Sequence, residues 1–149
     1  VNRGHSFEES ERMIHLTAEK GIHTGAHFIM GLPGETREMM LHTAGIISRM
    51  PMETVKFHQL QIMKNTPMAE EYVKNPGEFH LFGLEDYVDF FVDFLERLSP
   101  RLIIERFAGE APPRHLVNQV WKVRNYELIN MLEKRLEERG TCQGKFYKE

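Results

Sequence analysis

Two histidines are the first residues of this sequence whose type and placing suggest chemistry. His27 and His58 lie in two separate apolar runs, and alternation within each run places both on its less apolar side. Zinc needs three or four converging ligands. Glu105 or Glu110 are the candidates to join the pair, and no HxH or HxxxH pair lies on a predicted helix. We therefore expect both histidines to hydrogen-bond or contact a substrate, and we expect no dedicated metal site.

The stretch HFIMGLPGET, residues 27–36, is the second such feature, because an apolar run stops there at a turn rich in Gly and Pro. Gly31 and Gly34 permit backbone angles and close approaches that side chains forbid. Pro33 fixes its own φ, and Thr36 can cap a following helix. Any strand-to-helix connection can use this chemistry, so the turn predicts a shape and leaves its ligand open.

The composition limits the class of protein. The 149 residues are enough for one domain with its own core. No apolar run approaches the roughly 20 residues of a membrane span, so we expect no membrane partner. The single cysteine, Cys142, excludes an intrachain disulfide framework and a CxxC metal motif. No charged-then-apolar signal is found in the opening VNRGHS, and with so few cysteines we expect a reducing, cytoplasmic location.

The charge is unevenly distributed. Residues 1–96 carry 8 Lys and Arg against 15 Asp and Glu, whereas residues 97–149 carry 11 against 7. A basic end suits nucleic acid or phosphate, and aromatic residues among these cations suit stacking. The mixture comprises Trp121, Lys122, Arg124, Tyr126, Lys145, Phe146, Tyr147 and Lys148. Solvated helix faces are the simpler explanation, because EKRLEER at 133–139 alternates in sign as an exposed helix does.

The elements that position these residues alternate between helix and strand. Periodicity, caps and breakers predict the order α-β-α-β-α-α-β-α. This alternation implies a parallel sheet, and three strands leave both of its edges open to pairing. The predicted strands cover residues 22–30, 53–63 and 102–104, and the helices begin at the Ser6 capping box and cover about 36–49, 68–73, 84–98 and 123–139.

The two faces of the predicted sheet differ in polarity. Ala26, Phe28 and Met30 share one face of the first strand, while His27 and Ile29 share the other. The second strand repeats the pattern, with Val and Phe opposite Lys and His. An open doubly wound sheet needs apolar groups on both faces, whereas a barrel keeps them outside and tolerates a polar lumen. The pattern therefore favours part of a β/α barrel.

Four segments resemble the radical S-adenosylmethionine (SAM) superfamily. They are RGHSF at 3–7, HFIMGLPGET at 27–36, KFHQLQIMKNTPM at 56–68 and ERGTCQG at 138–144. The pattern is most similar to the uncharacterised iron–sulfur oxidoreductase subfamily that is itself similar to the catalytic subunit of Elongator. The resemblance covers almost the whole chain.

The resemblance implies an α/β fold that is the C-terminal part of a partial (β/α)6 TIM-like barrel. HFIMGLPGET would be its fifth strand and KFHQLQIMKNTP its sixth, with residues 1–113 in the barrel and 114–149 in a C-terminal helical extension. The CxxxCxxC loop for a 4Fe–4S cluster, and most SAM contacts, belong to earlier strands. We therefore expect a fragment that binds neither cofactor by itself and is inactive alone, while its full-length parent is an oxidoreductase.

The resemblance also implies roles for individual residues. The glycines would let backbone approach the adenosyl group, the apolar residues would contact adenine, and Glu35 would anchor the turn or reach a ligand hydroxyl. The implied cofactor-binding set is Ile29, Gly31, Leu32, Gly34, Glu35, Leu60 and Ile62. His27, His58, Arg106 and Glu110 are the substrate-side candidates, with an ordinary surface loop as the alternative for the last two. Cys142 is not implied to be a cluster ligand.

Three functions are compatible with these patterns. The leading one is a fragment of a radical SAM enzyme that cleaves SAM reductively and abstracts hydrogen from an unknown substrate. Its partners would be the missing N-terminal half of the barrel and, through exposed edges, further copies of itself. The alternative is a non-enzymatic module whose basic C-terminal end binds RNA, such as tRNA, or a protein. A complete small nucleotide-dependent enzyme ranks last, because GxxxxGK[ST] and GxGxxG are both absent.

Overall fold

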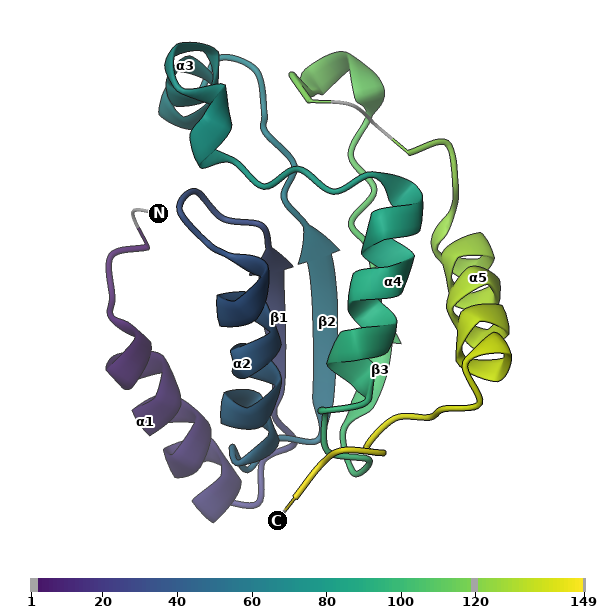
Figure 1. The fold of residues 1–149 in the computed structure, drawn as a ribbon. Coiled ribbons are helices and arrows are strands. Elements are labelled where there is room, and N and C mark those ends of the chain that lie inside the picture. The colour runs from purple at the N-terminus through teal and green to yellow at the C-terminus, as the bar shows by residue number, and fades with distance from the viewer. Residues whose placement is uncertain (1–2, 119–120, 149) are drawn as a thin grey trace.

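A computed structural model describes residues 3–118 and 121–148 of the chain (Figure 1). Helices and strands alternate in the predicted order. The elements are α1 (Phe7–Glu19), β1 (Gly25–Met30), α2 (Arg37–Ser48), β2 (Thr54–Gln59), α3 (Pro67–Lys74), η1 (Pro76–Glu78), α4 (Leu84–Leu95), β3 (Ile103–Arg106), η2 (Pro113–His115) and α5 (Asn125–Glu138).

The three strands form one parallel sheet in the order β1-β2-β3. The predicted strand at 53–63 is shorter, because the chain after Gln59 leaves β2 and pairs with a different segment. Met63 forms an antiparallel bridge with Leu116, and the Val117 amide donates to the Ile62 carbonyl at 2.9 Å. Residues 60–64 thus lie against 115–117 at the carboxyl end of the sheet.

Hydroxyl side chains cap the start of three helices, and the sequence predicts two of these caps, Ser6 and Thr36. Ser6 accepts a hydrogen bond from the amide of Glu9, and Thr36 accepts one from the amide of Met39. Thr66 does the same for α3. These bonds satisfy amides that have no partner within the helix, so the start of each helix is set locally.

Helices α2 and α4 cover one face of the sheet, the outer face (Figure 1). Phe57 points into this layer, and its ring centroid lies 5.2 Å from those of both Phe91 and Phe94. Met30 and Val55 are buried beside it. Aromatic pairs at such distances stabilise a core beyond their buried area, so the outer face holds the main core.

Helix α5 is attached to α4 by charged side chains as well as by Leu128 and Leu132. Arg139 contacts Asp89 at 2.6 Å and Asp93 at 2.8 Å, and Arg135 also pairs with Asp89. The two arginines lower the pKa of Asp89 despite the opposing effect of burial. The alternating charges at 133–139 therefore stabilise helix packing, in part, as well as facing solvent.

The opposite face of the sheet, the inner face, is exposed. Ile29 keeps 46% of its surface accessible and Ile103 keeps 62%, and His27, Glu105 and Arg106 are exposed as well. The predicted difference between the two faces is therefore present. Among the described helices, none is long and apolar enough to cross a membrane.

Candidate functional site

The inner face near the carboxyl ends of the strands brings the two histidines together. Strand pairing places Ile29 beside His58, and the His27 ring stacks on the His58 ring with centroids 5.5 Å apart and planes 23° apart. The apolar Ile29 thus lies at the strand end next to a pair of imidazoles. This surface can contact a planar ligand and exchange hydrogen bonds with it.

The His58 ring is the most constrained group on this face. Burial lowers its pKa, and the positive charges of His27, Arg106 and Lys56 lower it further. Its Nε2 atom is buried and has no hydrogen-bond partner among the described residues. The surroundings of His58 therefore favour the neutral imidazole, and among the described residues its Nε2 atom has no hydrogen-bond partner.

Lys56 and Glu105 form an ion pair on the same face, 2.9 Å apart. The hydrogen bond from Lys56, and a weaker one from Thr54, lower the pKa of the Glu105 carboxyl. Glu105 is thus paired with Lys56, and it joins no metal-ligating group with the histidines. Within residues 3–118 and 121–148, no three His, Cys, Asp or Glu side chains converge to hold a metal ion.

Gly109 closes the carboxyl end of the site through two glutamines. Its amide donates to Gln59 Oε1 at 2.9 Å, and its carbonyl accepts from Gln59 Nε2 at 3.2 Å and Gln61 Nε2 at 3.0 Å. A Cβ atom at this position would lie 2.7 Å from His58 Nδ1. The loop after β3 is thereby held against the His58 ring, and only glycine fits there without movement.

The turn after β1 is held by its own hydrogen bonds. Glu35 Oε2 accepts from the amides of Gly31 and Leu32, each at 3.0 Å, and the Gly34 amide donates to the Glu78 carbonyl at 2.9 Å. Of the two predicted roles of Glu35, the structure shows the anchoring one. Because these amides already have partners, the turn is left to contact a ligand through its shape, side chains and carbonyl groups.

The two glycines of the turn have different reasons to be glycine. Gly31 has φ of +86°, and a Cβ there would lie 2.5 Å from the His80 carbonyl oxygen. Gly34 has φ of +76°, with nothing within 4 Å of its Cβ position. The chain itself therefore requires glycine at 31 for packing, which the sequence did not reveal. Gly34 faces open space.

The remaining implied cofactor residues divide between the site and the core. Leu60 and Ile62 are buried in a second apolar cluster with Ala69 and Phe79, and Leu32 packs against that cluster. Ile62 thus packs beneath α3, and Leu60 also lines a cavity that is described below. Of the implied adenine contacts, Ile29 is the one whose side chain is exposed on the inner face.

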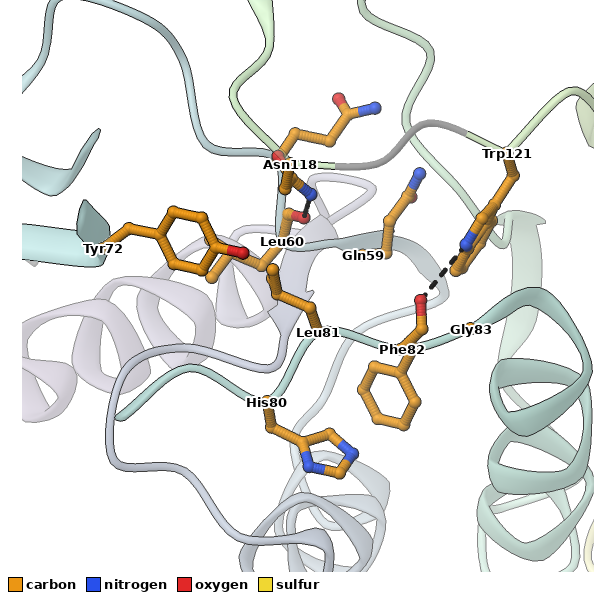
Figure 2. A pocket seen from close by; sticks show the side chains of 10 residues that line it. Gln59, Leu60, Tyr72, His80, Leu81, Phe82, Gly83, Asn118 and Trp121 are labelled. Atoms are coloured by element: carbon orange, nitrogen blue, oxygen red, sulfur yellow. Dashed lines mark hydrogen bonds between the residues drawn. The ribbon is translucent and has the colours of Figure 1, made fainter. Parts of the chain in front are cut away.

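Two cavities lie at the carboxyl end of β2, and they share Gln59, Gln61 and Trp121. The first, of 240 Å³, is shown in Figure 2. Trp121 Nε1 donates to the Phe82 carbonyl at 3.2 Å, and Asn118 Nδ2 donates to the Leu60 carbonyl at 3.2 Å (Figure 2). The sequence had suggested Trp121 only as a stacking residue of the basic C-terminal end. It gave no role to Asn118, Gln59 or Gln61, although Gln59 and Gln61 alternate with the buried residues Leu60 and Ile62.

The second cavity, of 490 Å³, contains one of the substrate-side candidates. Glu110 lines it, but its carboxylate accepts a hydrogen bond from the Asn125 amide at 3.1 Å and so caps α5. The candidate Arg106 lies instead at the end of β3, near His58. The structure therefore groups Arg106 with the two histidines and places Glu110 in a separate, structural position.

Comparison with known families finds the Radical_SAM C-terminal domain, whose family model matches residues 52–138. The matched region includes β2, β3, α4 and α5.

Two uncharacterised proteins are similar in sequence over nearly the whole chain. YtqA of Bacillus subtilis is 34% identical over 147 residues, which are 99% of this chain and 45% of that protein. MJ0486 of Methanocaldococcus jannaschii is 34% identical over 145 residues, 97% of this chain and 44% of that protein. The YhcC protein of Escherichia coli is 28% identical over 141 residues. The chain thus spans slightly less than half the length of these relatives.

A solved structure has the same fold. The archaeal Elp3 of Methanocaldococcus infernus, with an N-terminal deletion, superposes with a TM-score of 0.79 at 22% sequence identity. The superposition covers 95% of this chain and 33% of the Elp3 chain. It confirms the predicted fold class, a parallel α/β unit consistent with part of a TIM-like barrel.

Proposed function

Since the chain belongs to the Radical_SAM C-terminal domain family, we propose that it forms one wall of the SAM site in a larger radical SAM iron–sulfur enzyme. When bound in that enzyme, SAM and the 4Fe–4S cluster supply reductive cleavage and hydrogen abstraction from the substrate. The chain's own part is to bind and orient the adenosine portion at the carboxyl end of the inner face.

The 4Fe–4S cluster and SAM would need different kinds of binding group from this chain. A 4Fe–4S cluster needs several cysteine thiolates, whereas the sequence contains Cys142 alone. The proposal therefore assigns the cluster to a CxxxCxxC loop outside this sequence. Adenine needs an apolar surface and hydrogen-bonding groups at its edge, and the inner face offers both.

The observation that carries the proposal is the exposure of Ile29. An isoleucine 46% exposed at the carboxyl end of a parallel strand lies where ligands bind in β/α barrels. The turn beside it is pre-ordered by Glu35, so binding orders few new groups. We assign Ile29 to contact with the adenine ring, and the turn carbonyls to its amino group, because the turn amides are already bonded.

The test uses the full-length protein that contains this chain, with its cluster reconstituted anaerobically. Ile29→Glu places a carboxylate against the proposed adenine position. Burying that charge without a partner should weaken SAM binding about tenfold or more. Equilibrium binding of SAM and the yield of deoxyadenosine under reducing conditions measure the effect.

Ile103→Glu is the matched control, because Ile103 is also an exposed isoleucine on the inner face. Ile103 pairs with Thr54, which lies four residues before His58 on β2. Ile103 is therefore near the amino ends of the strands, away from the proposed adenine position. SAM binding should stay within about twofold of the wild type. Equal losses in the two variants, or no loss with Ile29→Glu, would refute the assignment of the adenine site.

A basic groove supports the RNA-binding alternative as a second candidate. Arg49, Arg97 and Lys148 line a 460 Å³ groove that runs along α2. Phe146 and Tyr147 also line it, and Glu38 is its one acidic residue among those described. Lys122 and Arg124 line the cavity at the carboxyl end instead. The basic residues predicted as one surface are therefore split between two places. Each place combines aromatic and basic side chains, and the groove has two aromatic residues, Phe146 and Tyr147, where the cavity has Trp121.

Charge reversal in the groove tests this candidate. Arg49→Glu combined with Arg97→Glu should weaken tRNA binding and reduce its salt dependence, because each phosphate contact releases counterions. Lys74→Glu, at the end of α3, is the control. Unchanged binding in the double variant would exclude the groove.

A further inference from the structure

The inner face holds more positive charge than its own carboxylates neutralise. Lys56 is paired with Glu105 at 2.9 Å, whereas no carboxylate of the described residues lies within 4 Å of the Arg106 guanidinium. The positive charge of Arg106 acts on His58, as do those of Lys56 and His27. Within residues 3–118 and 121–148, this end of the face therefore carries one permanent cation without a counterion.

An irregularity in β3 creates this arrangement. Val55 pairs with Ile104, but Lys56 pairs with Arg106, so Glu105 and Arg106 both lie opposite Lys56. A bulge of this kind re-aims side chains and is common beside active sites. Glu105 forms an ion pair with the Lys56 ammonium. The Arg106 guanidinium therefore remains available to bind another group.

The unsatisfied Nε2 atom of His58 is an independent sign of a missing partner. A buried polar atom without a hydrogen bond destabilises the folded state, so such atoms in native proteins usually have a ligand, water or ion beside them. Gly109 and the His27 ring hold the imidazole in place on two sides. The His58 ring is thus held in place by packing against these neighbours, and no hydrogen bond from another described residue holds it.

We propose that Arg106 and His58, with His27 stacked beside them, bind an anionic group of the substrate, a carboxylate or a phosphate. This inference rests on the proposed function, because it places the substrate next to the adenosine wall. An arginine fork suits the oxygens of either anion. The same anion would accept a hydrogen bond from the His58 imidazole.

Charge balance favours an anion over a neutral group. SAM carries a positive sulfonium, which cations on the same inner face repel. The charged and titratable groups that face His58 are His27 on β1, Lys56 on β2, and Glu105 and Arg106 on β3. Glu105 neutralises Lys56, so one anionic group would neutralise Arg106 and allow His58 to become protonated.

Inorganic phosphate and acetate are the probes, each titrated into the full-length protein with labelled histidines observed by NMR. Whichever probe matches the substrate anion should raise the pKa of His58, and the stronger binder identifies the class. Arg106→Gln should weaken its binding about tenfold or more, because a charge-assisted hydrogen bond is lost. Arg106→Lys should retain part of the affinity, and Arg114→Gln, on η2, should bind like the wild type.

Two results would overturn the inference. One is the absence of any probe-dependent shift at His58. The other is a His58 pKa that is already raised without a probe and does not respond to Arg106→Gln, since a carboxylate of the protein itself would then occupy the position. SAM cleavage by the same preparation separates the proposals: cleavage without anion binding refutes this inference alone, and anion binding without cleavage refutes the proposed function alone.

Discussion

The two faces of the sheet are made by the same three strands, yet one is packed with apolar side chains and the other exposes polar and charged ones. On the outer face Phe57 packs between Phe91 and Phe94 and is fully buried. On the inner face, one residue along the same strand, His58 has a ring nitrogen with no partner among the described residues, and the positive charge of Arg106 lies nearby. The outer face is completed by the chain's own helices, and the inner face is not.

This difference shows that the inner face is not an unfinished core. Parallel sheets are usually covered on both faces by apolar residues. Here the uncovered face carries imidazoles, an ion pair and Arg106, which pairs with no carboxylate in the part of the chain that the structure describes. Such groups are costly to bury without partners. Such a surface fits a ligand or a barrel lumen better than another layer of helices.

The largest expected effect concerns stability on the two faces. Phe57→Ala should lower the free energy of unfolding by about 4 kcal/mol, because it leaves a cavity among the rings of Phe28, Phe91 and Phe94. Ile103→Ala should change it by less than about 0.5 kcal/mol, because Ile103 is 62% exposed. Urea unfolding of both variants measures the contrast. Similar losses for the two would mean that the inner face is also core.

The turn after β1 repeats the contrast on a smaller scale. Gly31→Ala should lower the free energy of unfolding by about 3 kcal/mol, because its Cβ would meet the His80 carbonyl oxygen in a left-handed conformation. Gly34→Ala should cost about 1 kcal/mol, from the conformation alone. If urea unfolding gives equal costs, the close contact with His80 is not what fixes glycine at 31.

The smallest expected effect is a pH dependence from His58. Its folded pKa lies below the ordinary value of 6.5, so the unfolded chain binds protons more readily. The stability that neutral His58 contributes is complete above the ordinary pKa and is lost as the pH falls through the lowered one. His58→Gln should therefore flatten the decline in unfolding free energy between about pH 7 and about pH 5. His42→Gln, an exposed change on α2, should leave the decline unchanged.

Local patterns were enough to predict the order of elements and the two faces. Ser6 and Thr36 predict where helices begin, because each side chain can accept a hydrogen bond from an amide three residues later. Alternation assigns His27 and Phe28 to opposite faces without knowledge of the partner strand. The likeness of four short segments to the radical SAM superfamily then supplied the family, which the match to residues 52–138 shows.

Contacts between distant segments were not predictable in the same way. Gly31 meets His80, and Gly109 meets His58, across about 50 residues in each case. The residues around Gly31 do not predict that the His80 carbonyl lies against it. The burial of Ile62 beneath α3 likewise depends on residues 60–64 leaving the sheet to pair with a later segment.

Photo-crosslinking tests most directly whether the inner face is the adenosine wall. An azidoadenine derivative of SAM would be irradiated on the full-length, cluster-loaded protein, and the labelled peptides mapped by mass spectrometry. The account predicts label within residues 27–35, competed away by unmodified SAM and reduced by Ile29→Glu. Specific label confined to residues 72–83, which border the 240 Å³ cavity, or to the outer helices α2 and α4, would contradict it.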